Sequence, residues 1–94
     1  MKNLNTNEIW EIVQIILPYR LDRSSIVTNT KEKENILDIK IFSPETCEVY
    51  HIWIDLENYD IQIWIYDAWE PSYMVAPKNI IKYVEYINSL KENK

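Results

Sequence analysis

Alternating apolar and polar positions dominate the middle of the chain, in the stretch 51–69, HIWIDLENYDIQIWIYDAW. Isoleucine occupies every second position, and aromatic and polar residues occupy the positions between. Successive side chains of a strand point to opposite faces of a sheet. The pattern therefore predicts two strands, Cys47–Asp55 and Ile61–Trp69, joined by a turn over Leu56–Asp60. One face of this pair would be aliphatic and the other aromatic and polar.

Two further strands are expected before this pair. Ser24–Thr30 is rich in β-branched residues, which favour strands. Asn35–Phe42 alternates between aliphatic and mixed positions. The charged stretch Lys31–Glu34 is expected to be a solvated turn between them. Ser43–Thr46, with a proline at its second position, is expected to turn the chain into the next strand.

Helical spacing of apolar residues marks both ends of the chain. Asn5–Leu17 carries isoleucine, valine and leucine at helical intervals. Asn5 and Glu8 have the spacing of a capping box, and Pro18 ends the helix. After a loop over Glu70–Pro77, a second helix is expected over Pro77–Lys91, with the proline in its first turn. Its expected core residues are Ile80, Val84, Ile87 and Leu90, with Ile81 and Tyr83 beside them.

The order of helix, four strands with short connections, and helix predicts a single α+β domain over residues 1–94. Short connections favour a four-stranded antiparallel meander, and both helices would pack on one face of it, giving the order α-β-β-β-β-α. The residues expected beneath the helices are Leu37, Ile39, Ile41, Ile52, Ile54, Ile61, Ile63 and Ile65. The residues expected on the open face are Phe42, Val49, Trp53, Trp64 and Tyr66.

Composition excludes several classes of protein. The chain has no glycine, which argues against the glycine-rich phosphate loops of nucleotide-binding proteins. Its one cysteine, Cys47, excludes an internal disulfide. No apolar run is long enough to span a membrane and no signal-peptide core opens the chain, so we expect a cytoplasmic protein without membrane contact.

Negative charge gathers on the same part of the chain as the aromatic residues. The net charge is −5, yet residues 1–40 sum to zero and residues 78–94 sum to +2. Residues 41–77 hold seven acidic residues and no lysine or arginine. Such a field repels phosphates and attracts basic surfaces. We therefore expect no direct nucleic-acid binding, although aromatic residues on a sheet can stack bases when basic groups surround them.

The candidates for catalysis and metal binding are weak. Cys47, His51 and Asp55 share one face of a predicted strand, but four residues of strand span about 13 Å, beyond the reach of a proton relay. Asp55, Glu57 and Asp60 could offer carboxylates to a cation, but their spacing lacks the EF-hand pattern. Asp55 and Asp67 have no fixed separation that would suit acid–base catalysis. We expect neither enzymatic activity nor a catalytic residue, metal site or cofactor.

The leading hypothesis from the sequence is a non-enzymatic inhibitor that binds a basic protein, such as a nuclease. Bacterial immunity proteins and phage anti-defence proteins such as anti-CRISPRs are of this physical type. In this hypothesis Trp53, Trp64 and Tyr66 supply contact area, because tryptophan and tyrosine are enriched among interface anchors. The acidic residues expected to replace phosphates are Glu48, Asp55, Asp67 and Glu70. The alternatives are a module that binds or sequesters a small molecule, and a homo-oligomeric structural domain, such as a homodimer that buries the aromatic face.

Overall fold

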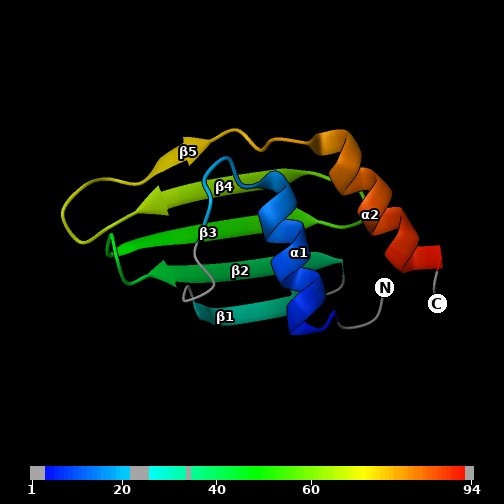
Figure 1. Ribbon diagram of the computed structural model, residues 1–94, viewed down its shortest axis with the longest axis horizontal. Helices are drawn as coiled ribbons and strands as arrows, with labels where there is room; N and C mark the ends of the chain where they lie inside the picture. Colours follow the sequence, from blue (N-terminus) through cyan, green and yellow to red (C-terminus); the bar gives the residue numbers. More distant parts are fainter. Residues whose placement is uncertain (1–3, 22–25, 34, 93–94) are drawn as a thin grey trace.

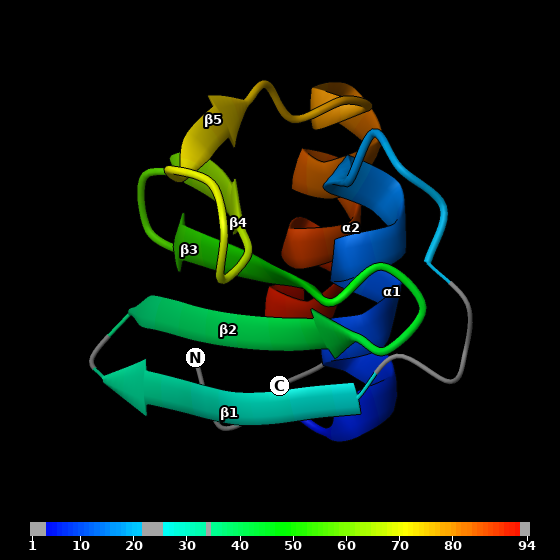
Figure 2. The ribbon, with the colours of Figure 1, turned by 90° about the vertical axis from the view of Figure 1, so that its left-hand side faces the viewer.

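The protein folds as one antiparallel sheet with two helices on the same face (Figures 1 and 2). The computed structural model describes residues 4–21, 26–33 and 35–92, with 26–33 described by their backbone. The elements are α1 (Thr6–Ile16), β1 (Ile26–Lys33), β2 (Ile36–Ser43), β3 (Glu48–Asp55), β4 (Ile61–Tyr66), β5 (Tyr73–Val75) and α2 (Ile80–Glu92). The strands follow one another in the order β1-β2-β3-β4-β5. The predicted α+β order of helix, four antiparallel strands and helix is confirmed, and the short strand β5 extends the meander at one edge.

The core lies between the sheet and the helices, on the face that the alternation of isoleucines predicts. Ile39, Ile52 and Ile63 occupy partner positions on β2, β3 and β4, and all three are fully buried. Branched side chains stand roughly perpendicular to a sheet, and these three belong to one buried cluster with helix residues such as Ile12 and Tyr83. Of the residues expected beneath the helices, only Ile61, at the start of β4, is half-buried instead of buried.

Helix α1 forms where its capping signals place it. The Asn5 side chain accepts a hydrogen bond from the Glu8 N–H, and the Glu8 carboxylate accepts one from the Asn5 N–H, at 2.8 and 2.9 Å. This capping box satisfies two amides that the first turn of a helix leaves unpaired. Leu17, the residue before Pro18, is extended and caps the other end.

The first hairpin corrects the sequence prediction. Residues expected in a solvated turn, Lys31–Lys33, instead continue β1, and their backbones pair with Asp38–Ile36 of β2. Pairing across the sheet overrides the weak strand preference of a charged stretch. Ser24, Ser25 and Glu34, which the sequence assigned to the strand and the turn, lie outside the described residues.

Strand β4 is shorter than its alternation suggests. It ends at Tyr66, because the Asp67 carboxylate accepts hydrogen bonds from the N–H groups of Trp69 and Glu70 and turns the chain. The prediction that Asp67–Trp69 belong to this strand is therefore wrong. The stretch beyond, expected to be entirely loop, returns along β4 as β5.

Helix α2 begins at Ile80, three residues later than predicted. The Lys78 N–H donates to the Ile16 carbonyl, and the Asn79 side chain donates to the Ile15 carbonyl, so this segment is bound to the end of α1. Asn79 also adopts a left-handed conformation, with φ 54°. The helix buries Tyr83, Ile87 and Leu90. Ile80, predicted to be a core residue, is instead exposed.

Candidate functional site: the aromatic face of the sheet

The face of the sheet opposite the helices carries the aromatic residues that the sequence singled out. We call this surface the aromatic face. Its residues are Phe42, Val49, His51, Trp53, Trp64 and Tyr66, which alternate with buried residues along β2–β4, and Met74 of β5, which pairs with Trp64. No helix or strand within the described ranges covers it, as the end-on view in Figure 2 shows.

Strand register sets the arrangement of these side chains in three rows. Val49 pairs with Phe42 on one side and with Tyr66 on the other. His51 pairs with Lys40 and Trp64, and Trp64 in turn pairs with Met74. Trp53 pairs with Asp38 and Gln62. Direct partners on adjacent strands have Cβ atoms about 5 Å apart, so the aromatic residues form a continuous surface.

The centre of the aromatic face is slightly hollowed. His51, Trp53, Gln62, Trp64, Tyr66 and Ser72 line an open hollow of about 440 Å³. Ser72 comes from the connection between β4 and β5, so this connection forms one wall. Trp53, Trp64 and Tyr66 are half-buried, and each therefore keeps part of its ring accessible. Three of the seven site residues predicted from the sequence thus meet around one depression.

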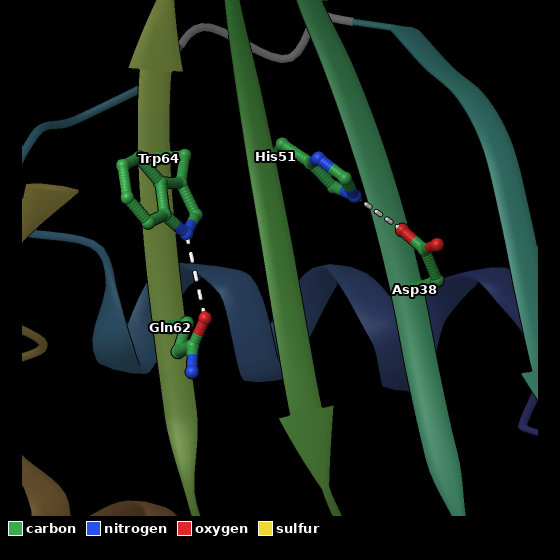
Figure 3. A network of polar contacts seen from close by, with 4 residues as sticks. All are labelled: Asp38, His51, Gln62 and Trp64. Carbon is green, nitrogen blue, oxygen red and sulfur yellow. Dashed lines mark hydrogen bonds and ion pairs between the residues drawn. The ribbon is translucent and has the colours of Figure 1, made fainter. Parts of the chain in front are cut away.

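A hydrogen bond between a histidine and an aspartate, which the sequence did not predict, lies beside this hollow. His51 Nε2 and Asp38 Oδ1 are 2.6 Å apart, and both side chains are about one-third exposed (Figure 3). The two residues are diagonal neighbours on β3 and β2. The alternation places both on the same face, but only the strand register brings them together. On the next strand, Trp64 Nε1 donates a long hydrogen bond to Gln62 Oε1, at 3.4 Å (Figure 3).

Two of the predicted acidic site residues also shape turns. Asp55, at the end of β3, accepts hydrogen bonds from the backbone N–H groups of Glu57 and Asn58 and from the Asn58 side chain. These hydrogen bonds, led by that from the Asn58 backbone, lower the pKa of the Asp55 carboxyl group. Asp67 turns the chain after β4 in the same way. Both carboxylates lie at the ends of the sheet.

The remaining two predicted acids lie apart from the tryptophans. Glu48 lies at a position of β3 on the helix-covered face of the sheet. Its carboxylate accepts a hydrogen bond from the Tyr50 hydroxyl at 3.4 Å. Burial and the Glu48 charge raise the pKa of Tyr50. Glu70 is exposed in the connection between β4 and β5. Glu48 is therefore not brought together with the aromatic face, whereas Glu70 borders it.

Negative charge lies around the aromatic face and not within it. The centre holds Asp38 and Lys40 together with His51, so the described charges there nearly cancel. The acids of the surrounding turns form what we call the acidic rim: Glu45, Asp55, Glu57, Asp60, Asp67 and Glu70. The sequence pattern suggested an acidic face, and the register instead yields an aromatic centre whose described charges nearly cancel, with an acidic border.

Cys47 does not share a strand with His51. It lies in the turn before β3, exposed and with φ 58°. Its backbone N–H donates to the Ser43 carbonyl and closes this turn. Across the described residues, no three histidine, cysteine or acidic side chains are grouped as ligands for a metal ion.

Comparison with protein-family models, with curated proteins and with solved structures finds no match to this chain. Neither helix of the described ranges is long and apolar enough to cross a membrane.

Proposed function

We propose that the protein is a non-enzymatic inhibitor that binds a basic protein through its aromatic face and covers the positively charged site of that protein. Immunity proteins of bacterial toxins and phage anti-defence proteins, such as anti-CRISPRs, are of this type. A nuclease is the kind of target that fits, because its substrate-binding surface is positively charged where it contacts phosphates.

One observation carries the proposal: the uncovered aromatic centre is bordered by acidic turns. Protein interfaces typically have an aromatic, desolvated centre and a polar rim, and tryptophan and tyrosine dominate their binding energy. Phe42 and Met74, 37% and 53% exposed, enlarge the apolar centre on the described strands. A contiguous apolar surface of this kind on a small domain is a mark of association.

In this mechanism the aromatic residues at the centre and the acidic residues at the rim have different roles. Trp53, Trp64 and Tyr66 supply buried contact area. Asp55, Asp67 and Glu70 stand where phosphates of a nucleic acid would contact the target. Charges at a rim mainly accelerate association and select the partner, whereas the buried centre determines how slowly the complex dissociates.

The target is identified by placing a photo-crosslinking amino acid at Met74, which keeps all tryptophans in place. The matched control carries it at Ile81, 78% exposed on α2. We expect the Met74 variant, but not the Ile81 variant, to cross-link to a basic protein in cells. The purified target should then lose activity on stoichiometric addition of this protein. Cross-links only between copies of this chain, or a captured protein whose activity is unaffected, would contradict the proposal.

The energetic test uses the purified pair. Trp64→Ala should weaken binding by about 2 kcal/mol, or about 30-fold, if Trp64 is an interface anchor. Added salt should lower the association rate more than it raises the dissociation rate. Glu85→Gln, on the exposed side of α2, serves as the control and should leave both rates unchanged.

A small-molecule-binding module is the second candidate, and the hollow beside Trp53 and Trp64 favours it. Its volume falls within the range of ligand sites, which are usually concave and largely apolar. Because this hollow is open, it suits contact with a protein surface better than enclosure of a small ligand. A soluble aromatic compound that quenches tryptophan fluorescence saturably, in wild type but not in Trp64→Phe, would support this second candidate.

A further inference from the structure

A second hollow lies on the other side of the molecule, where the end of α1 meets the start of α2. It has a volume of about 500 Å³, and its lining residues are Val13, Gln14, Leu17, Tyr19, Arg20, Leu21 and Lys78. Figure 2 shows the chain leaving α1 beside the first turn of α2. Two segments distant in the sequence, residues 13–21 and Lys78, therefore contribute to one depression, and this depression is independent of the aromatic face.

The charge of this hollow is opposite to that of the chain as a whole. Among the described residues, the two charged residues that line it, Arg20 and Lys78, are both cationic. The chain carries a net charge of −5, so two cations in the described lining differ from its general composition. The Gln14 amide adds hydrogen-bond donors on the same wall.

The start of α2 adds to this local positive potential. Helix α2 starts two residues after Lys78, and its first turn contains no acidic residue. The amino end of a helix carries partial positive charge. At the end of α1, the carbonyl oxygens of Ile15 and Ile16 already accept hydrogen bonds from Asn79 and Lys78, so an incoming anion meets no unpaired carbonyl at these two positions.

Contacts hold the backbone of Lys78 and the residue that precedes Arg20. Lys78 donates its N–H to Ile16 at 2.9 Å, which ties its backbone to α1. Arg20 follows Tyr19, whose ring packs against Tyr50 with centroids 6.5 Å apart. A site whose backbone is already ordered loses less entropy when a ligand binds.

We propose that this hollow binds a phosphoryl group, with Arg20 and Lys78 as its cationic ligands and Gln14 as a neutral donor. An arginine fork binds two oxygen atoms of a phosphate, and a lysine ammonium binds a third as a point charge. The donor set thus suits a tetrahedral dianion better than a planar carboxylate.

The test is a titration of ¹⁵N-labelled protein with sodium phosphate at constant ionic strength, balanced with sodium chloride. We expect saturable shifts of the amide signals of Gln14, Arg20 and Lys78, with a dissociation constant in the millimolar range. Arg20→Gln and Lys78→Gln should each weaken binding at least fivefold. Lys82→Gln, a cation in α2 that does not line the hollow, should change it less than twofold.

Two further ligands distinguish the chemistry and the source of the anion. Sodium acetate should give no saturable shift, and equal binding of acetate and phosphate would overturn the assignment of a phosphoryl group. Adenosine monophosphate should compete with inorganic phosphate and show the same dependence on Arg20 and Lys78. Tighter binding of the monophosphate would identify a phosphate ester as the ligand, whereas tighter binding of phosphate would identify the free anion.

Thermal unfolding separates ligand binding from a purely structural role of the two cations. A bound anion raises the melting temperature in proportion to its binding. Phosphate should therefore raise the melting temperature of wild type and Lys82→Gln more than that of Arg20→Gln or Lys78→Gln. If all four proteins respond equally to phosphate, or if their amide shifts stay linear in concentration, the two residues only stabilise the end of α1 and the proposal is wrong.

Discussion

The helix-covered face and the aromatic face share the same strands but differ in what their side chains do. Along β3, Ile52 points into the core and is fully buried, whereas its neighbours His51 and Trp53 point outward and are half-buried. Burial of aliphatic surface stabilises the fold by about 25 cal/mol per Å². The outward residues are large and partly accessible, and their packing is incomplete in this chain alone. One alternation therefore separates residues that hold the fold from residues available to a partner.

The largest expected effect tests this division on adjacent residues. Ile52→Ala should lower the free energy of unfolding by about 2–5 kcal/mol, because it leaves a cavity beneath the helices. His51→Ala removes a one-third exposed contact with Asp38 and should cost less than about 1 kcal/mol. Urea denaturation of the two variants and wild type measures both changes. Similar losses in the two variants would show that the outward residues also hold the fold.

A second prediction concerns tyrosine hydroxyls on the two faces. The Tyr83 hydroxyl is buried in the core and has no hydrogen-bond partner among the described residues, and burial raises its pKa. Tyr83→Phe should stabilise the protein by about 1 kcal/mol, since an unsatisfied buried hydroxyl is unfavourable. Tyr66→Phe, on the aromatic face, should change stability by less than about 0.5 kcal/mol. A loss of stability in Tyr83→Phe would reveal a partner for that hydroxyl.

The turns at the two ends of β3 allow a third comparison, because each holds a non-glycine residue in the left-handed region. Cys47 has φ 58° and an exposed side chain, so Cys47→Gly should stabilise by about 1 kcal/mol. Tyr59 has φ 63°, but its hydroxyl donates to Asn88 and its ring lies 4.7 Å from Lys91 Nζ. Tyr59→Gly should therefore destabilise despite relief of backbone strain. Thermal unfolding of the two variants should give shifts of opposite sign.

The smallest effect concerns the acidic rim and pH. Hydrogen bonds hold the pKa of Asp55 below its ordinary value of 3.8 in the folded protein. The stability from this carboxylate is thus present above pH 3.8 and is lost as the pH falls through the folded value. Asp55→Asn should be less stable than wild type at pH 7, and the difference should shrink in acid. A difference that stays constant from pH 7 to pH 2 in urea unfolding would contradict this role.

The alternation predicted which residues of β2–β4 face the core, because a strand with one buried face has apolar residues at every second position of its own sequence. The three-residue spacing of Asn5 and Glu8 predicted the helix cap that these residues form. Pairing between distant segments was not predictable in this way. The continuation of β1 through Lys33 and the existence of β5 both depend on a neighbouring strand, which local preferences do not reveal.

The candidate site was predictable in its aromatic half and not in its charged half. Trp53 and Trp64 lie on the open face, as their positions between isoleucines require. The contact between Asp38 and His51 depends on the register of β2 and β3, which single-sequence patterns leave open. The turn-forming role of Asp67 could have been inferred, because aspartate commonly accepts hydrogen bonds from amides two and three residues ahead.

The two edges of the sheet have a consequence for self-assembly. An exposed, regular edge strand can recruit strands from other molecules and lead to aggregates or filaments. Here β5 is three residues long, with Pro71 before it and Pro77 after it. On the opposite edge, the register of β1 is interrupted between Val27 and Asn29. Both edges are thus poor templates for strand addition, and a chain rich in isoleucine and tryptophan can present its broad surface without polymerising through its sides.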